Sequence, residues 1–198
     1  MPNLLIAGDS FAADYTVKYP DQLGWPNMLD QSYSVTNVAQ AAVTEYKILQ
    51  QIKSADLNKY DSIIVAHASP NRVHCERHPI HFDDPLHKSA DLMYNDLLNH
   101  PGNEDAVAAV NYFEKFFELT YYSDISTLLC LEIANILGNY PHLNQLHLVN
   151  YYNNDPYDFL PDSFNYNKIW FKNQGLMNHF DDKGNKQMAE AVLKRLSI

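Results

Sequence analysis

Cysteine is scarce in this chain of 198 residues, which contains only Cys75 and Cys130. Two cysteines without a regular spacing do not make a disulfide framework. The first residues, Met-Pro-Asn-Leu-Leu-Ile-Ala, have no basic region and too short an apolar run for a signal peptide. We therefore expect a cytoplasmic protein that keeps both thiols reduced.

Basic residues and long apolar stretches are also few. The chain has 14 Lys and Arg against 24 Asp and Glu, which gives a formal net charge of −10. Proteins that bind nucleic acid or a membrane surface need clustered basic side chains, so we expect neither partner. No stretch approaches the roughly 20 apolar residues of a membrane-spanning helix.

Apolar residues are plentiful, at 46% of the chain, and 198 residues are enough for one compact domain over residues 1–198. Short apolar runs at 3–7, 33–38, 61–66 and 145–150 predict strands. Helical spacing appears at 44–54 after Thr44 as a cap, at 104–137 as one or two helices, and at 182–196. The alternation predicts a three-layer α/β/α sandwich with a mostly parallel sheet, whose sites lie at the carboxyl ends of the strands.

Residues 67–101 interrupt this alternation and are rich in His, Pro and Asp. A loop this long predicts an insertion or a functional lid. Its metal-ligating side chains suggest a zinc site, but their spacing matches no common ligand pattern, so we predict no metal. They are His67, His74, Cys75, His78, His81 and His87.

Gly8-Asp9-Ser10 follows the first predicted strand directly, and His179 precedes the last predicted helix. Taken alone, Ser10 reads as a turn serine, because Gly, Asp and Ser are ordinary turn formers. Together with Gly24-Trp25-Pro26, however, the two blocks resemble those of the SGNH (GDSL-type) hydrolase family. The resemblance implies a flavodoxin-like SGNH fold, with Ser10 as nucleophile and His179 as its base.

The two middle blocks of this family are less well matched. The resemblance implies an oxyanion hole made by the backbone N–H of Ser10, the N–H of Ala42 and the side chain of Asn71. Ala42 stands where the family has glycine, which would matter if the backbone needs a positive φ. His67 or Ser69 could take the role of Asn71.

The family also has an aspartate three residues before the histidine, and this position is Leu176 here. The alternatives are a Ser-His dyad, a backbone carbonyl as the group that orients His179, or a carboxylate from Asp155, Asp158 or Asp181. Loss of the acid from a working triad costs roughly 10⁴ in turnover, so this departure bears on activity more than on fold.

By resemblance, the function is hydrolysis of a small ester or an O-acylated carbohydrate through an acyl-enzyme, without a cofactor. Residues 151–166, rich in Asn, Asp and aromatic side chains, are the predicted region of substrate contact. An O-acyltransferase that uses the same serine, and a non-catalytic glycan-binding protein on the same fold, are the alternatives. The sequence does not predict the oligomeric state.

Overall fold

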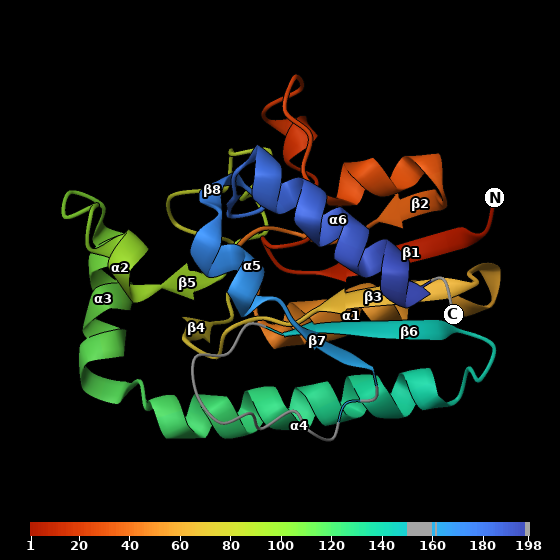
Figure 1. Cartoon of the computed structure of the whole chain (residues 1–198). Helices are drawn as coiled ribbons and strands as arrows, with labels where there is room; N and C mark the ends of the chain where they lie inside the picture. Colours follow the sequence, from red (N-terminus) through yellow and green to blue (C-terminus); the bar gives the residue numbers. More distant parts are fainter. Residues whose placement is uncertain (150–159, 161, 197–198) are drawn as a thin grey trace.

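A five-stranded parallel sheet forms the centre of the protein in this computed structural model, which describes residues 1–149, 160 and 162–196 (Figure 1). The strand order is β2-β1-β3-β6-β7, and every pairing in the sheet is parallel. The strands are β1 (Asn3–Gly8), β2 (Ser34–Asn37), β3 (Ser62–Ala66), β6 (Asn144–Val149) and β7 (Ser163–Asn165). The predicted α/β class with a mostly parallel sheet is confirmed, as are the four predicted strands.

The central strands bury both faces, because their side chains alternate between two apolar cores. In β1, Leu4 and Ile6 enter one core while Leu5 and Ala7 enter the other. β3 repeats the pattern, with Ile64 in the first core and Ile63 in the second. A strand buried on both faces is apolar throughout, which explains why short continuous runs marked these strands in the sequence.

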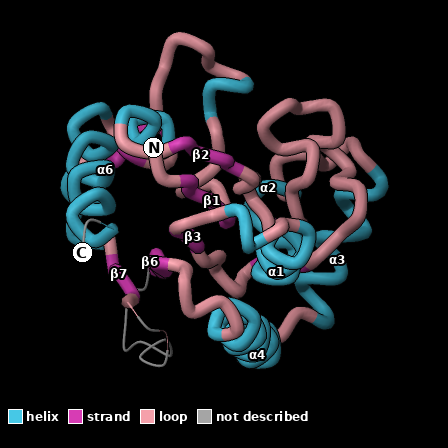
Figure 2. The backbone as a smooth tube through the Cα atoms, turned by 90° about the vertical axis from the view of Figure 1, so that its right-hand side faces the viewer, coloured by secondary structure: helices cyan, strands magenta, loops and turns pink. Residues whose placement is uncertain are grey.

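Helices cover the two faces of the sheet (Figure 2). One face packs against α1 (Glu45–Ser54) and α4 (Leu119–Gly138), the other against α6 (Asp182–Leu196) and a 3₁₀ helix, Pro26–Gln31. Thr44 is the N-cap of α1, although its side chain makes no capping hydrogen bond. The predicted helical stretch 104–137 forms two helices, α3 (Glu104–Phe116) and α4. The predicted final helix is confirmed.

Three short elements of the C-terminal part were not predicted: β7, α5 (Asn167–Lys172) and β8 (Gln174–Met177). Each is too short to show a clear hydrophobic period. β8 does not join the central sheet, and its two ends instead bridge to Phe180. It forms a tight turn that leads into α6 at the carboxyl edge of the sheet.

The segment 67–101 lies at the same edge and is partly structured. It contains an antiparallel pair, β4 (Arg72–Val73) with β5 (Leu92–Met93), followed by α2 (Tyr94–Leu97). Its Leu86 is buried against Ala13, Ala41 and Met177. The segment is therefore attached to the turns that follow β1 and β2.

None of the helices in the described part of the chain combines the length and the apolar character that crossing a membrane requires. Cys75 and Cys130 are not joined in a disulfide.

Candidate active site

The turn after β1 presents Ser10 at the carboxyl edge of the sheet. Gly8 has a φ of 149°, and a Cβ there would lie 2.6 Å from Ala66, so the close packing of β1 on β3 requires glycine. The carbonyl of Asp9 accepts from the N–H groups of Ala12 and Ala13, and its carboxylate accepts from the N–H of Phe11. These bonds close the turn around Ser10.

His179 reaches the same turn from the far end of the chain. Its Nε2 lies 2.8 Å from Ser10 Oγ, although 169 residues separate the two. Its ring packs at 4.4 Å, centroid to centroid, on that of Phe11. His179 and Asn178 have φ values of 64° and 50°, which are uncommon for residues other than glycine and are often found at functional sites.

Asn178 holds the two turns together. Its Nδ2 donates to the carbonyl of Ser10 at 3.3 Å and to that of Ala13 at 2.8 Å. Its side chain is fully buried against Gly24, where a Cβ would meet Asn178 Oδ1 at 1.7 Å. The glycine of the Gly24-Trp25-Pro26 block is therefore needed for this close approach.

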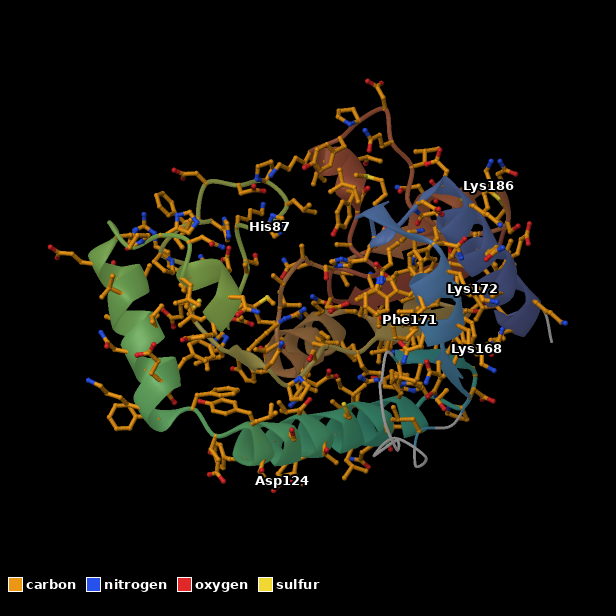
Figure 3. The ribbon with its side chains drawn as sticks, turned by 60° about the vertical axis from the view of Figure 1, so that its left-hand side comes forward. His87, Asp124, Lys168, Phe171, Lys172 and Lys186 are labelled. Carbon is orange, nitrogen blue, oxygen red and sulfur yellow. The ribbon has the colours of Figure 1, made fainter. Side chains whose placement is uncertain are left out.

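Burial keeps His179 neutral. The pKa of His179 is lowered to about 4, first by burial and then by the charges of Arg72 and His87. Figure 3 shows His87 on the insertion, so this segment contributes to the electrostatics of the site. A neutral imidazole can accept the hydroxyl hydrogen of Ser10 at Nε2 when its own proton is on Nδ1.

In the described part of the chain, no carboxylate contacts Nδ1 of His179. Leu176, at the position of the expected acid, is 59% exposed on β8. Asp181 accepts from the N–H of Gly184 in the first turn of α6. Asp155 and Asp158 lie outside the described residues. The arrangement that the structure describes is thus a Ser-His dyad.

Two backbone N–H groups at this edge are available for a ligand oxygen. Within the described residues, neither the N–H of Ser10 nor that of Ala42 donates to an acceptor. Ala42 has a φ of 60°, so its backbone adopts the conformation that glycine would take most easily. The turn of Ala42 lies beside β1, because Gln40 N donates to the carbonyl of Gly8.

Asn71 and its neighbour Arg72 point to different places. Asn71 is exposed and lines a cavity with residues of β5, α2 and α3. Arg72 is buried, its guanidinium lies 3.3 Å from Asp9 Oδ2, and Nη1 also donates to the carbonyl of Val43. Burial raises the pKa of Asp9, and the charge of Arg72 opposes that rise. Arg72 therefore links the turns that carry Ser10 and Ala42.

Comparison with known proteins identifies the fold. One similar solved structure is that of a protein assigned to the G-D-S-L lipolytic family from Desulfitobacterium hafniense DCB-2. The similarity covers 98% of this chain and 99% of that protein's chain, with a TM-score of 0.53 and 12% sequence identity. The chain shares the fold of that protein. A catalytic mutant of Axe2, an acetylxylan esterase from Geobacillus stearothermophilus, is similar over 100% of this chain and 94% of its own, with a TM-score of 0.48 and 12% identity. No protein-family model and no curated protein sequence matches the chain.

The other predicted oxyanion candidates have different surroundings. His67 is buried, and its Nδ1 lies 2.7 Å from Glu45 Oε1 while its Nε2 lies 2.9 Å from His147 Nδ1. Glu45 also accepts from the N–H of Ala68. Ser69 lines a pocket of about 80 Å³, partly open to solvent, between α1 and α4. In the predicted substrate region, residues 150–159 and 161 lie outside the described part, Ser163–Asn165 form β7, and Tyr166 is buried.

Within the described residues, two groups bring metal-ligating atoms within 4.8 Å of one another. In the first, Glu45 and Cys130 both lie close to Nδ1 of His67, at 2.7 and 3.4 Å. Ligands at about 2.0–2.3 Å from a tetrahedral zinc stand more than about 3 Å apart, so the shorter contact fits a hydrogen bond better than shared ligation.

The second group is His78, His81 and Asp96 in the insertion. His78 Nδ1 accepts the N–H groups of Ile80 and His81, which places the ring proton on Nε2, the atom that would have to bind a metal. The remaining candidates have other partners: His74 and the N–H of Cys75 bond to Asp91, and His87 bonds to Asp84. Neither group has the protonation and spacing of a metal centre.

Sequence reasoning missed Arg72 and Asn178, and it considered His87 only as a candidate metal ligand. Arg72 and Asn178 stand next to assigned residues in the sequence, but nothing local shows that they turn inward. The sequence offered one signal for the inward position of Arg72: it is a basic residue directly after Asn71 in a strongly acidic chain.

Proposed function

We propose that this protein hydrolyses carboxylic esters through an acyl-enzyme, with Ser10 as nucleophile and His179 as general base. The observation that carries the proposal is the 2.8 Å contact between Ser10 Oγ and His179 Nε2. A nucleophile within hydrogen-bonding reach of a neutral base is the arrangement that activates a serine hydroxyl. The shared fold with a G-D-S-L protein is consistent with it.

In the first step, Ser10 Oγ bonds to the carbonyl carbon of the ester while its proton passes to His179 Nε2. The carbonyl oxygen becomes an oxyanion, which the N–H groups of Ser10 and Ala42 would stabilise. The tetrahedral intermediate then collapses, the bond to the alcohol oxygen breaks, and the imidazolium returns its proton to the leaving alcohol. Water next attacks the acyl-enzyme with His179 again as base, which releases the acid and restores Ser10.

Asn71 as a third oxyanion donor stays a prediction, and its exposed side chain does not favour it. Removal of one oxyanion donor typically costs about 2.7–4 kcal/mol of transition-state stabilisation. Asn71→Ala therefore tests the assignment: a fall in kcat of about 10²-fold or more would support it. From its location we expect a change of less than threefold.

A fluorophosphonate probe followed by p-nitrophenyl acetate turnover tests the function itself. We expect stoichiometric labelling that Ser10→Ala abolishes, and a fall in kcat of about 10²–10⁴-fold in His179→Asn. Ser54→Ala is the control, because Ser54 is exposed and is the last residue of α1. Labelling and turnover that persist in Ser10→Ala would refute the proposal.

A non-catalytic glycan-binding protein is the second candidate, and the absence of a carboxylate at His179 Nδ1 in the described part of the chain favours it. The same labelling experiment decides between the two, because a binding protein shows neither Ser10-dependent labelling nor turnover. An acyltransferase would label at Ser10 as well. Product analysis with and without a sugar acceptor separates transfer from hydrolysis.

A further inference from the structure

The charges of this acidic protein are unevenly distributed along the chain. Residues 1–162 hold 21 Asp and Glu against 8 Lys and Arg, whereas residues 163–198 hold 3 against 6. The C-terminal segment, which contains α5, β8 and α6, is therefore basic. Such an asymmetry concentrates positive potential on one part of the surface while the rest stays negative.

Three exposed lysines of this segment lie on the same helix as an exposed aromatic ring or on the neighbouring helix (Figure 3). Lys168 and Lys172 lie on α5 with Phe171, which is 52% exposed, and Lys186 lies on α6. The two helices are joined by a 3.1 Å hydrogen bond between Asn173 and Gln187, the neighbours of Lys172 and Lys186. We refer to Lys168, Phe171, Lys172 and Lys186 as the basic patch.

The lysines of the basic patch differ from several others in the chain. Lys18, Lys47, Lys53 and Lys59 each form an ion pair with a carboxylate. Within residues 1–149, 160 and 162–196, no such pair involves Lys168, Lys172 or Lys186. Among these described residues no carboxylate neutralises their charges, so an external anion can pair with them.

The basic patch is continuous with the candidate active site. The ring of His179 packs on Phe11, Phe11 lies 6.2 Å from Trp170 edge to face, and Trp170 lies 5.0 Å from Phe171. This row of rings leads from the half-buried imidazole of His179 to the exposed Phe171. A molecule bound on the basic patch can therefore extend to Ser10.

We propose that the basic patch binds an acidic polysaccharide, which forms the alcohol half of the ester; this inference rests on the proposed function. Lysines provide charge complementarity to the carboxylates of uronic acid units, and aromatic faces pack against sugar rings. The negative remainder of the chain repels polyanions, so only a polymer that contacts the patch locally binds well. The substrate is thus an O-acylated acidic glycan.

Binding of polygalacturonate to the Ser10→Ala protein tests the proposal without turnover. The triple variant Lys168→Gln/Lys172→Gln/Lys186→Gln is compared with Lys53→Gln/Lys59→Gln/Lys115→Gln, which removes the same charge elsewhere. Each surface contact changes affinity by a factor of about 1.4–5, so we expect Kd to rise about tenfold in the first triple variant and less than threefold in the control. We expect salt at 0.5 M to weaken the binding of polygalacturonate to both the Ser10→Ala protein and the control variant, because salt screens exposed charges.

The aromatic contribution has its own matched pair. Phe171→Ser should raise Kd for polygalacturonate about fivefold, whereas Phe116→Ser, at a residue that is 72% exposed on α3, should leave it unchanged. In the otherwise native protein, the Lys168, Lys172 and Lys186 triple variant should show a raised KM for acetylated polygalacturonate. The Lys53, Lys59 and Lys115 control should keep the wild-type KM for this substrate and turn over p-nitrophenyl acetate within twofold of the wild type. If the proposed hydrolysis is wrong, turnover is absent but polygalacturonate can still bind. If the proposed glycan binding is wrong, turnover of p-nitrophenyl acetate remains, so the two outcomes are distinguishable.

Three results would overturn the proposal. The first is an unchanged Kd for polygalacturonate in the triple variant of the basic patch. The second is equal affinity for polyglutamate with no effect of Phe171→Ser, which would mean that the patch binds anionic polymers without regard to sugar. The third is tighter binding to an oligothymidylate or to phosphatidylglycerol vesicles, which would assign the patch to nucleic acid or to a membrane.

Discussion

His179 is a weak base because it is enclosed. Its imidazole packs on Phe11 and lies within the electrostatic influence of Arg72, so the charged form is unfavourable. A weaker base removes the serine proton less readily, but it also stays unprotonated well below neutral pH. The dyad is therefore suited to function over a wide pH range.

The pH profile of ester turnover is the corresponding prediction. Because the pKa of His179 is lowered to about 4, kcat/KM for p-nitrophenyl acetate should rise with pH through about 4 and be level from pH 6 to 8. Initial rates in buffers of constant ionic strength measure this. A midpoint near 6.5, the value of an exposed histidine, would show that the site is more open to water than the structure indicates.

Ala42 adopts a left-handed backbone conformation that costs an L-residue roughly 1–2 kcal/mol. Ala42→Gly removes this strain, while the greater freedom of glycine in the unfolded chain offsets about 0.4–1 kcal/mol. We expect a net stabilisation of about 0.5–1 kcal/mol and a rise in Tm of about 1–4 °C by calorimetry. Ala41 lies two residues before Val43 in the same turn, and its φ is not positive. We therefore expect Ala41→Gly to destabilise the protein.

At the scale of elements, Arg72 fastens three carboxyl-edge segments to one another. It belongs to β4 in the insertion, pairs with Asp9 after β1, and donates to the carbonyl of Val43 before α1. Side chains that connect separate turns keep backbone N–H groups in fixed relative positions. The insertion thereby supports the candidate site.

Breaking this buried pair should be costly. Arg72→Met leaves Asp9 without its partner, and removal of one member of a buried ion pair typically costs about 3–5 kcal/mol. Asp9→Asn in the same background removes the uncompensated charge and should restore part of that stability. Urea denaturation of the single and double variants measures both effects, and a double variant no more stable than Arg72→Met would contradict the pairing.

For the molecule as a whole, buried neutral histidines set a stability limit in acid. The pKa values of His78, His147 and His179 are lowered to about 4, 3 and 4, chiefly by burial. Below the unfolded value of 6.5 the unfolded chain binds more protons than the folded one, so the free energy of unfolding falls as the pH decreases. The loss begins near pH 6.5 and continues toward pH 4.

Denaturation at pH 7, 6 and 5 measures this loss. Each such histidine contributes at most about 1.4 kcal/mol per pH unit. His147→Gln keeps a polar group beside His67 and removes one titrating site. Because the pKa of His87 is also lowered, the slope between pH 6 and 5 should decrease by about a quarter to a third. An identical slope in the variant and the wild type would show that His147 does not take part.

Much of the fold followed from the sequence, because local patterns determine it. Continuous apolar runs identified β1 and β3, and the spacing of Met188, Val192 and Leu196 identified α6. The short β7, α5 and β8 have no comparable pattern, since their formation depends on neighbours far away in the chain. The single-domain boundary at 1–198 stays a prediction.

The sequence by itself determined which residues carry reactive groups and on which side of a strand or helix they stand. Only the tertiary structure decided which of them meet: it brought Ser10 and His179 together, turned Arg72 inward and Asn71 outward, and gathered the basic patch from α5 and α6. The physical reason is that hydrophobic periodicity is a property of consecutive residues, whereas a hydrogen bond or a surface charge cluster depends on how distant segments pack.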